Sequence, residues 1–429
     1  MTASKSTTPA AFIGIVGDVS IATGASDDFA YSIDGGSGIN TIDLGDGNNV
    51  VWLEGGHNTI ITGSGNDSIG IGNGDDIVTT GNGDDFVYSV GKVSDSTNVI
   101  DLGDGNNQAW LAGGDNIVTA GLGNNSIGIG YGNDTVTTGN GDDFVYSVGN
   151  VSGSQNVIDL GNGDNTVWLE GGHNTIAIGN GDDAVTVGDG DDFVYSVGDV
   201  SDSANVINLG DGNDQAWLAG GDNTVTASSG NNTIGIGGGN DTVSTGNGDD
   251  FIYSIASGGG NNVLELGEGN NTVWVEGGSY TITAGAGADS IGLGLGVDHV
   301  KAGDGANVIY TISPAKAGDK VIATGGDDDY IQTGAGNDLI NGGSGFNTVV
   351  TGKGNDEVFA SSDAYTYIGD FEIGADVITL SGVSFDELTF SQGTGADATD
   401  AFAAVNGDIV LQLENVAVGD FSLQSNFTS

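Results

Sequence analysis

The sequence predicts an all-β solenoid, in which short parallel strands stack coil upon coil. The first observation is a nine-residue unit, seen as GNGDDFVYS at Gly81–Ser89, that recurs through most of the chain. The second is the central residue of each unit. Stepping from Val87, mostly by nine residues, this residue is Ile or Val in nearly every unit between Ala30 and Tyr367, and it is never charged. The interior of a solenoid requires such an apolar residue at fixed spacing.

Each unit reads as a tight turn followed by a very short strand. The Gly-x-Gly-x-Asp segment comes first, and its glycines permit the positive φ angles that a tight turn needs. The aspartate places a carboxylate beside the carbonyl groups of that turn. In the strand that follows, the middle residue faces one side and its two neighbours face the other. One unit cannot bury a core by itself, so the copies must stack on one another.

The repeated GxGxDxUx pattern, where U is a large apolar residue, resembles the repeats-in-toxin (RTX) family, also described as the hemolysin-type calcium-binding region. The resemblance extends from Ala30 to Tyr367. It implies a right-handed parallel β-roll, an RTX solenoid of about 18 coils and roughly 85 Å in length at about 4.8 Å per coil. It also implies that several Ca²⁺ ions bind in the turns.

The residue just before each strand is the candidate metal ligand. It is Asp in many units and Asn in others, such as Asn98 and Asn107, with Tyr at 280 and 365. Carboxylate and carbonyl oxygens suit Ca²⁺, whereas stacked Asn side chains can form amide ladders instead. We therefore expect patchy calcium binding. The predicted metal ligands are Asp28, Asp67, Asp76, Asp85, Asp134, Asp143, Asp183, Asp192, Asp214, Asp241, Asp250, Asp289, Asp298, Asp319, Asp329, Asp338 and Asp356.

A longer period is superimposed on the nine-residue unit. Phe29, Phe86, Phe144, Phe193 and Phe251 occupy the same place in DDFxYS, at intervals of 57 or 58 residues and, once, 49. The 49-residue interval lacks one whole unit. Because successive units belong to opposite sheets of a two-sheet roll, the loss of one unit reverses this alternation. We therefore expect the aromatic stripe to move to the opposite sheet near Phe193.

Aromatic residues of this longer period are predicted to share an outer face, opposite a polar, Thr-rich face. The predicted surface-contact residues are Phe29, Tyr31, Trp52, Phe86, Tyr88, Trp110, Phe144, Tyr146, Trp168, Phe193, Tyr195, Trp217, Phe251, Tyr253 and Trp274. These rings either pack only along neighbouring strands or form a binding face. A binding face suits a second copy of the chain or the sugars of a polysaccharide. The regular spacing favours a second copy, whereas ice binding through the Thr face is disfavoured by its irregularity.

Composition restricts the partners further. The chain has 59 acidic and six basic residues and a formal charge of −53, which disfavours nucleic acids and insertion into anionic membranes. Such a polyanion is expected to be disordered until a cation neutralises it. Cysteine is absent, and no HExxH, GxSxG or GxxxxGK motif occurs. We therefore predict a non-enzyme, in which His57 and His173 are polar turn residues.

Three regions are predicted. Residues 1–19 form an N-terminal tail and cap, residues 20–367 form the β-roll, and residues 368–429 form a C-terminal β cap. The last region resembles the C-terminal segment of RTX exoproteins, which carries an uncleaved type I secretion signal. No signal peptide or membrane-spanning stretch is evident. The resemblance implies a secreted or cell-surface protein of a Gram-negative bacterium. We predict a structural role at the cell surface or in the extracellular matrix, with a carbohydrate-binding adhesin as the alternative.

Overall fold

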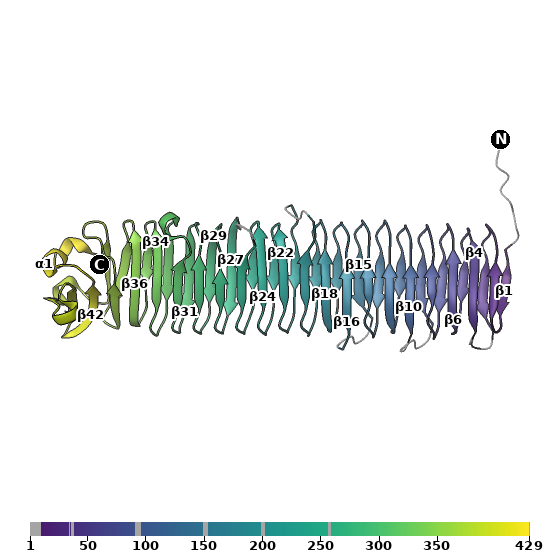
Figure 1. Cartoon of the computed structure of the whole chain (residues 1–429), viewed down its shortest axis with the longest axis horizontal. Helices are drawn as coiled ribbons and strands as arrows, with labels where there is room; N and C mark the ends of the chain where they lie inside the picture. The colour runs from purple at the N-terminus through teal and green to yellow at the C-terminus, as the bar shows by residue number, and fades with distance from the viewer. Residues whose placement is uncertain are drawn as a thin grey trace, which may run out of the picture. The chain divides into compact units, whose positions relative to one another are not determined.

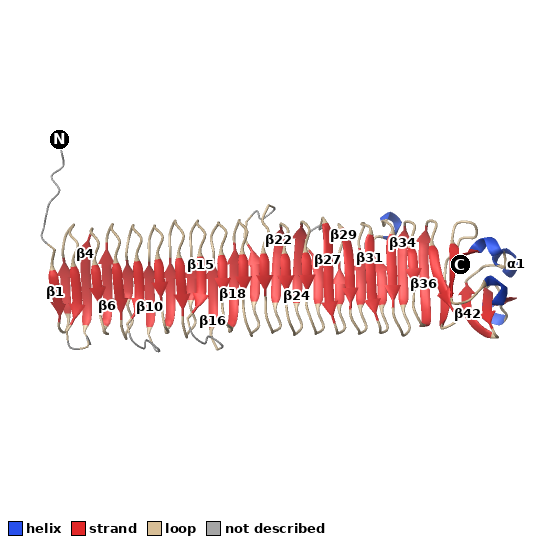
Figure 2. Ribbon diagram, turned by 180° about the vertical axis from the view of Figure 1, so that it is seen from behind, coloured by secondary structure: helices blue, strands red, loops and turns tan. Residues whose placement is uncertain are grey.

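The computed structural model of the chain describes residues 10–33, 35, 38–90, 96–148, 153–198, 202–255 and 259–428. The chain forms two compact units, the N-terminal unit (Met1–Ala216) and the C-terminal unit (Trp217–Ser429). Each unit is a parallel β-solenoid, built from short strands joined by tight turns (Figures 1 and 2). The predicted all-β fold class is confirmed.

In the N-terminal unit, turns and strands alternate from the first described residues onward. Its strands are β1 (Phe12–Ile15), β2 (Val19–Ala22), β3 (Phe29–Ser32), β4 (Ile39–Gly45), β5 (Val50–Trp52), β6 (His57–Thr62), β7 (Ser68–Ile71), β8 (Ile77–Thr79), β9 (Phe86–Ser89), β10 (Thr97–Asp101), β11 (Gln108–Trp110), β12 (Asp115–Thr119), β13 (Ser126–Ile129), β14 (Thr135–Thr137), β15 (Phe144–Ser147), β16 (Gln155–Asp159), β17 (Thr166–Trp168), β18 (His173–Ile178), β19 (Ala184–Thr186), β20 (Phe193–Ser196) and β21 (Val206–Asn208). Strand β22 (Gln215–Gly220) begins in this unit and ends in the next.

The C-terminal unit repeats this architecture and adds short helices. Its elements are β23 (Thr224–Thr226), β24 (Thr233–Gly238), β25 (Thr242–Ser244), β26 (Phe251–Ser254), β27 (Asn261–Gly267), β28 (Thr272–Trp274), β29 (Ser279–Ala284), β30 (Ser290–Leu293), β31 (Asp298–Gly303), β32 (Val308–Thr311), η1 (Pro314–Lys316), β33 (Lys320–Thr324), β34 (Tyr330–Ala335), β35 (Leu339–Asn341), β36 (Gly345–Lys353), β37 (Glu357–Ser361), β38 (Ala364–Ile368), β39 (Val377–Ser381), η2 (Phe385–Glu387), β40 (Leu388–Gln392), η3 (Gly395–Asp397), β41 (Ala401–Val405), β42 (Asp408–Leu413), α1 (Val418–Phe421), η4 (Gln424–Asn426) and β43 (Phe427–Thr428).

Strands pair in parallel with the strand two positions along the chain, so each unit has an odd-numbered sheet and an even-numbered sheet. In β9, β11 and β13 the register aligns Val87, Ala109 and Ile127. These central residues are no more than 1% exposed, as are their counterparts in the other sheet, for example Ile100 in β10. The column of central residues read from the sequence is therefore the core.

The turns bring the backbones of neighbouring coils close together. Gly83 has a φ of 144°, and a Cβ built on it would lie 1.8 Å from the carbonyl oxygen of Gly65 in the adjacent coil. Any side chain here would require both a strained backbone and a displaced coil. The glycine of the repeat is thus needed for the stacking of turns as well as for the turn itself.

The prediction that Tyr367 is the last inward residue is wrong by one position. Ile368 pairs with Val349 and is fully buried, whereas Tyr367 pairs with Thr348 and is only half-buried. The hydroxyl of Tyr367 instead donates a hydrogen bond to Glu414, at 2.6 Å. The turn between β37 and β38 holds one more residue than the nine-residue step allows, and this shifts the register.

The last two strands of the solenoid have further partners in the C-terminal segment. Strand β42 pairs with β38 and β43 pairs with β39, both in parallel, while β40, β41 and β42 form antiparallel pairs. The rings of Phe385, Phe390, Phe421 and Phe427 lie in contact beside these strands, with centroids 5.1–5.8 Å apart. Neither β38 nor β39 is therefore left as an unpaired edge.

Candidate functional site

The residue two places before each central residue points into the turn. We call these residues the turn column; each unit has one such column before its odd strands and one before its even strands. Before the odd strands from β3 onward it holds Asp28, Asn49, Asp67, Asp85, Asn107, Asn125, Asp143, Asn165, Asp183, Asn205, Asn223, Asp241, Asn262, Tyr280, Asp298, Lys320, Asp338, Asp356 and Asp376. Before the even strands it holds Asn40, Asn58, Asp76, Asn98, Asn116, Asp134, Asn156, Asn174, Asp192, Asp214, Asn232, Asp250, Asn271, Asp289, Asn307, Asp329, Asn347 and Thr366. All of these residues are almost completely buried.

Side-chain oxygens of the turn column bind the backbone of the neighbouring coil. The amide N–H of Asp67 donates to Oδ1 of Asp85 at 2.8 Å, and that of Asp85 donates to Oδ1 of Asn107 at 2.9 Å. A buried N–H group needs an acceptor, and in these coils either an Asp or an Asn side chain supplies one at the same reach. This explains why the column alternates freely between these two residue types.

In the Asn turns, the amide nitrogen fills the centre of the turn. Nδ2 of Asn49 donates to the carbonyl oxygens of Gly45 and Gly47, both at 3.1 Å. Nδ2 of Asn307 likewise donates to the carbonyl oxygens of Gly303 and Gly305, at 3.2 and 2.8 Å. The backbone of the turn therefore aims two carbonyl oxygens, from the residues two and four places earlier, at the column side chain.

The predicted amide ladders are confirmed where Asn residues occupy successive coils. Nδ2 of Asn98 donates to Oδ1 of Asn116 at 2.9 Å, and Nδ2 of Asn156 donates to Oδ1 of Asn174 at 2.9 Å. These amide pairs bond to each other without a cation.

In the Asp turns, an oxygen takes the place of this amide nitrogen. Oδ1 keeps its role in the ladder, so Oδ2 is the second polar atom of the side chain and, unlike an amide nitrogen, has no proton to donate to the turn carbonyl oxygens. Buried oxygens that meet without a donor are unfavourable unless a proton or a cation joins them. In the part of the chain that the structure describes, Oδ2 accepts no hydrogen bond in Asp28, Asp67, Asp76, Asp85, Asp134, Asp143, Asp183, Asp192, Asp241, Asp250, Asp289, Asp329, Asp338 and Asp356.

Burial makes ionisation of most of the turn carboxyl groups less favourable, which raises their pKa. Burial raises the pKa of Asp134 to about 7. Burial also raises the pKa of Asp214 to about 7, and the charge of Asp192 in the adjacent coil adds to the rise. For Asp356 the pKa is again about 7, because of burial and then the charges of Asp338 and Asp376. These turns favour a bound positive charge.

The donor set fits Ca²⁺. Calcium binds carboxylate and backbone carbonyl oxygens in flexible arrangements, and each Asp turn offers one free carboxylate oxygen and two carbonyl oxygens. Negative charge is most concentrated where successive coils both carry Asp, as in Asp67–Asp85 and Asp192–Asp214. Among the described residues, no three His, Cys, Asp or Glu side chains form a cluster. Each coil supplies one carboxylate to a column, so the backbone must provide the remaining ligands.

All the predicted metal ligands except Asp319 lie in the turn column. Asp319 is exposed, and its Oδ1 accepts a hydrogen bond from the amide N–H of Asn337 at 2.8 Å. Lys320 occupies the column position instead and is completely buried. The irregular turn that contains η1 (Pro314–Lys316) lengthens this coil, so counting from the preceding strand points to the wrong residue. Similarly, Thr366 rather than Tyr365 follows Asn347 in the even column.

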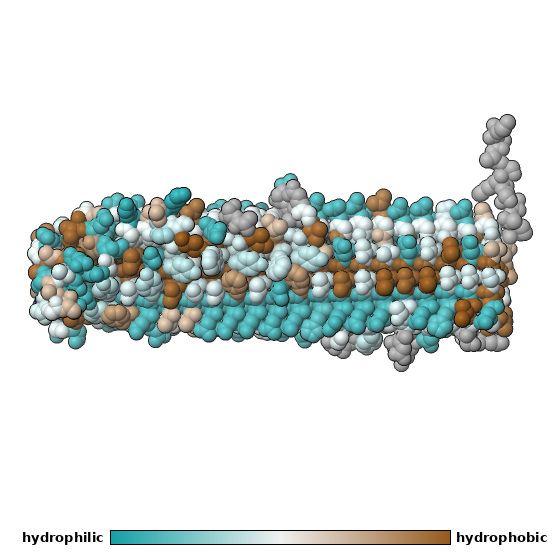
Figure 3. Space-filling view, in the orientation of Figure 1, coloured by the Kyte–Doolittle hydropathy of each residue, from teal (hydrophilic) through white to brown (hydrophobic). Residues whose placement is uncertain are grey.

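A second, exposed ladder runs one residue earlier in each turn, and the sequence-based analysis missed it. The amide N–H of Asp84 donates to Oδ1 of Asn66 at 3.1 Å, and that of Asn106 donates to Oδ1 of Asp84 at 2.8 Å. The acidic and amide pairs of the repeat, such as DD and NN, were the available signal. Figure 3 shows a continuous hydrophilic row along the N-terminal unit, beside a row of apolar side chains.

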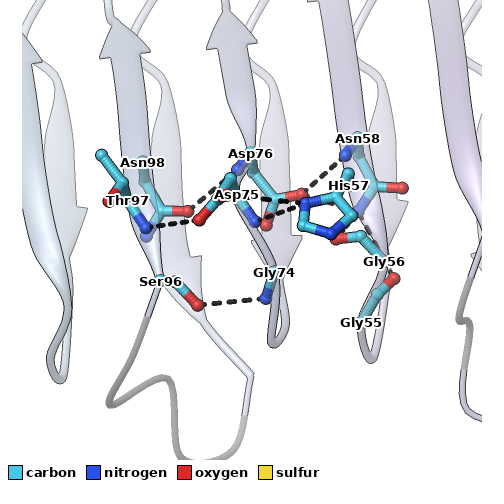
Figure 4. A network of polar contacts seen from close by, with 10 residues as sticks. All are labelled: Gly55, Gly56, His57, Asn58, Gly74, Asp75, Asp76, Ser96, Thr97 and Asn98. Carbon is cyan, nitrogen blue, oxygen red and sulfur yellow. Dashed lines mark hydrogen bonds and ion pairs between the residues drawn. The ribbon is translucent and has the colours of Figure 1, made fainter.

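His57 and His173 belong to this exposed ladder, which confirms them as polar turn residues. Nδ1 of His57 accepts a hydrogen bond from the amide N–H of Asp75 at 3.1 Å, and Nδ1 of His173 accepts one from Asp191 at 2.9 Å. Figure 4 shows the two ladders side by side, with His57 in the exposed one and Asp76 in the buried one. Nδ1 of each imidazole thus accepts the backbone hydrogen bond that an Asp or Asn oxygen accepts in other turns.

The predicted change of sheet by the aromatic stripe is confirmed within the N-terminal unit. Phe29, Phe86 and Phe144 lie in β3, β9 and β15 of the odd sheet, whereas Phe193 lies in β20 of the even sheet. Counting units modulo two was sufficient to predict this. In the C-terminal unit, Phe251 lies in β26, whose Tyr253 pairs with Trp274 of β28.

The rings of the stripe are packed to different degrees. Phe86 and Tyr88 stack with centroids 4.9 Å apart, and both are half-buried. Tyr146 lies across Gly128 of the previous coil, where a Cβ would come within 2.8 Å of its ring. Trp110, next to Tyr88 in the register, is 55% exposed. The Phe and Tyr rings are therefore partly structural, while the indoles of Trp52, Trp110 and Trp168 are about half exposed.

The opposite face of the N-terminal unit is less polar than predicted. Thr79, Asp101 and Thr119 do form one outward row of the even sheet. The adjacent outward row, however, contains Ile77, Val99, Ile117 and Val157, each 40–50% exposed. The predicted Thr-rich face is thus half aliphatic.

Comparison with known proteins agrees with the geometry of the turns. A family model of the RTX calcium-binding nonapeptide repeat matches residues 34–69, 72–89, 94–127, 130–147, 152–176, 199–234, 237–254, 256–291, 323–358 and 333–366. No curated protein matches the chain. In the described part of the chain, no helix is long and apolar enough to cross a membrane.

Proposed function

The chain belongs to the family of RTX calcium-binding nonapeptide repeat proteins, and on this premise we propose that it is a secreted structural protein that folds when calcium fills its Asp turns. The observation that carries the proposal is the row of buried Asp Oδ2 atoms that have no hydrogen-bond donor. No nucleophile, base or reactive cavity is part of this role, so it is not an enzymatic one.

Calcium binding and folding are coupled in this proposal. The formal charge of −53 opposes compaction of the chain at the low calcium concentration inside a cell. Extracellular calcium is high enough to bind sites of modest affinity. Because the sites exist only in the folded turns, the binding free energy becomes folding free energy.

The test is a calcium titration of the full chain, followed by circular dichroism and small-angle X-ray scattering. We expect an expanded chain in chelator and a compact β-rich protein with calcium. Replacing Asp67 and Asp85 together by Asn should lower the number of bound calcium ions, because amide donors would fill both turns. Asp84→Asn removes an exposed charge in the same coil and should leave that number unchanged. A chain that is equally compact and β-rich in chelator would overturn the proposal.

Residues 368–429 are proposed to cap the solenoid and to carry the type I secretion signal. The pairing of β42 and β43 with the last coil strands supports a capping role, since open strand edges invite aggregation. In cells with a type I secretion apparatus, the full chain should reach the medium and a chain without residues 368–429 should remain inside. Equal secretion of both chains would exclude a signal in this segment.

The proposed surface role is lateral self-association through the aromatic stripe. Its support is the regular series of exposed indoles, which are 49% exposed at Trp52 and 55% at Trp168. Replacing Trp52, Trp110 and Trp168 by Gln should abolish calcium-dependent growth in mass, as measured by sedimentation velocity. A chain that stays monomeric but loses binding to a surface polysaccharide in the same variant would instead establish the carbohydrate-binding adhesin.

A further inference from the structure

One Asp turn in the C-terminal unit already contains a positive charge. Lys320 holds the column position before β33, and its side chain reaches back into the turn of Asp298. Its ammonium nitrogen lies 2.9 Å from Oδ2 of Asp298, and both side chains are completely buried. It also donates to the carbonyl oxygens of Gly294 and Gly296, at 3.2 and 2.5 Å.

These three oxygens correspond to the donor set of the other Asp turns. Gly296 and Gly294 stand two and four places before Asp298, as Gly305 and Gly303 stand before Asn307. In the Asn307 turn, the amide nitrogen donates to both carbonyl oxygens. In the Asp298 turn, the ammonium of the next coil does so and meets the free carboxylate oxygen as well.

The buried ladder continues on both sides of Lys320 but lacks a side-chain acceptor there. The amide N–H of Tyr280 donates to Oδ1 of Asp298 at 2.9 Å, and that of Lys320 donates to Oδ1 of Asp338 at 2.7 Å. Lysine has no acceptor oxygen, so the amide N–H of Asp298 donates to the backbone carbonyl oxygen of Asp319 instead, at 3.2 Å. The Lys320 side chain therefore takes no part in the ladder and enters the Asp298 turn.

We propose that Lys320 is a tethered cation that takes the place of calcium in the Asp298 turn, so that this turn closes without a metal ion. The inference rests on the proposed function, in which the other Asp turns bind calcium. A buried ammonium needs an acceptor for each of its three N–H groups. Here the acceptors are the column carboxylate and the two carbonyl oxygens that correspond to those bound by Nδ2 of Asn307, which assigns the ammonium to the cation position itself.

Lys320→Asn tests this directly, because Asn is the common neutral residue of the column. Without the ammonium, the Asp298 turn has the same free oxygens as the other Asp turns. Calcium bound per chain, counted by equilibrium dialysis, should rise by one ion. The double variant Lys320→Asn with Asp298→Asn should return to the wild-type number, because it reproduces an Asn–Asn pair. Lys301→Asn, at an exposed lysine, should also leave the number unchanged.

Each outcome separates this inference from the proposed function. If the wild-type chain binds no calcium, the proposed function fails. If it binds calcium but Lys320→Asn binds the same number of ions, only the role of Lys320 is overturned. Should the variant not fold, wild-type crystals grown in excess calcium decide the question. Continuous density from Lys320 to the Asp298 turn, without an ion there, supports the inference, and a calcium ion in that turn overturns it.

Discussion

The Asn98–Asn116 pair and the Asp67–Asp85 pair occupy the same place in their coils but differ in charge. In the first pair, Nδ2 of Asn98 donates to Oδ1 of Asn116 at 2.9 Å. In the second, the amide N–H of Asp67 is bound by Oδ1 of Asp85, but Oδ2 of neither residue has a donor. The Asn pair therefore stacks without a metal ion, and only the Asp pair lacks a donor. In the proposed function, an Asp turn therefore folds only with a bound cation, whereas an Asn turn folds without one.

Lowering the pH should reduce the difference between Asp turns and Asn turns most strongly, because protonation neutralises all the Asp turns together. The folded-state pKa is raised from 3.8 to about 6 in Asp76 and Asp192 and to about 7 in Asp134, mainly by burial. Between about pH 4 and pH 7, the folded state thus binds more protons than the unfolded state, so its stability falls as pH rises. Calcium-free protein should be more resistant to urea at pH 5.5 than at pH 8. A stability that rises with pH in this window would contradict the assignment.

Replacing Asn by Asp in the turn column should have the next largest effect. Asn98→Asp combined with Asn116→Asp places two more uncompensated carboxylates in the buried column. At pH 8, in the lowest calcium concentration that keeps the wild-type chain folded, we expect a loss of about 3–5 kcal/mol, in the range for an unpaired buried charge. Further calcium should restore most of this loss, and urea denaturation at low and high calcium measures it. A variant as stable as wild type at low calcium would show that column carboxylates carry no penalty.

A smaller effect is expected from removing one ladder acceptor. Asp85→Ala leaves the buried amide N–H of Asp67 without a partner, which costs about 1–3 kcal/mol. Asp85→Asn retains that acceptor and supplies an amide donor, so it should be at least as stable as wild type in the lowest calcium concentration that keeps wild type folded. Comparing the two variants separates the role of Oδ1 in the ladder from that of Oδ2 in cation binding. Equal destabilisation by both would mean that the ladder does not depend on Oδ1.

The smallest effect is expected in the exposed ladder. Asp84 is solvent-exposed, and its Oδ1 accepts a hydrogen bond from the amide N–H of Asn106. Asp84→Asn retains this acceptor, so the free energy of unfolding should change by less than about 0.5 kcal/mol, as for most surface substitutions. A change comparable with that of Asp85→Ala would show that the two ladders are not distinct in energy.

The sequence predicted the regular part of this protein well because one local rule is repeated. An apolar residue such as Val87 every nine residues determines the core, and an odd or even count of units determines the sheet. The rule failed at Asp319 and Tyr367, where longer turns shift the count. Hydrogen-bond geometry is needed to see that Asn49 fills its turn with a donor while Asp67 does not. The position of Lys320 could not be read from spacing, since its side chain acts in a neighbouring coil.

The sheet change of the aromatic stripe has a consequence for valency. In the N-terminal unit, the rings from Phe29 to Trp168 face outward from one sheet, and those of Phe193 and Tyr195 face outward from the other. A stripe confined to one sheet could only pair two molecules face to face. If the stripe mediates self-association as proposed, the missing nonapeptide would give one molecule aromatic contact patches on two opposite sides, so that it could act as a cross-link. Loss of nine residues would then change a surface suited to a dimer into one suited to a network.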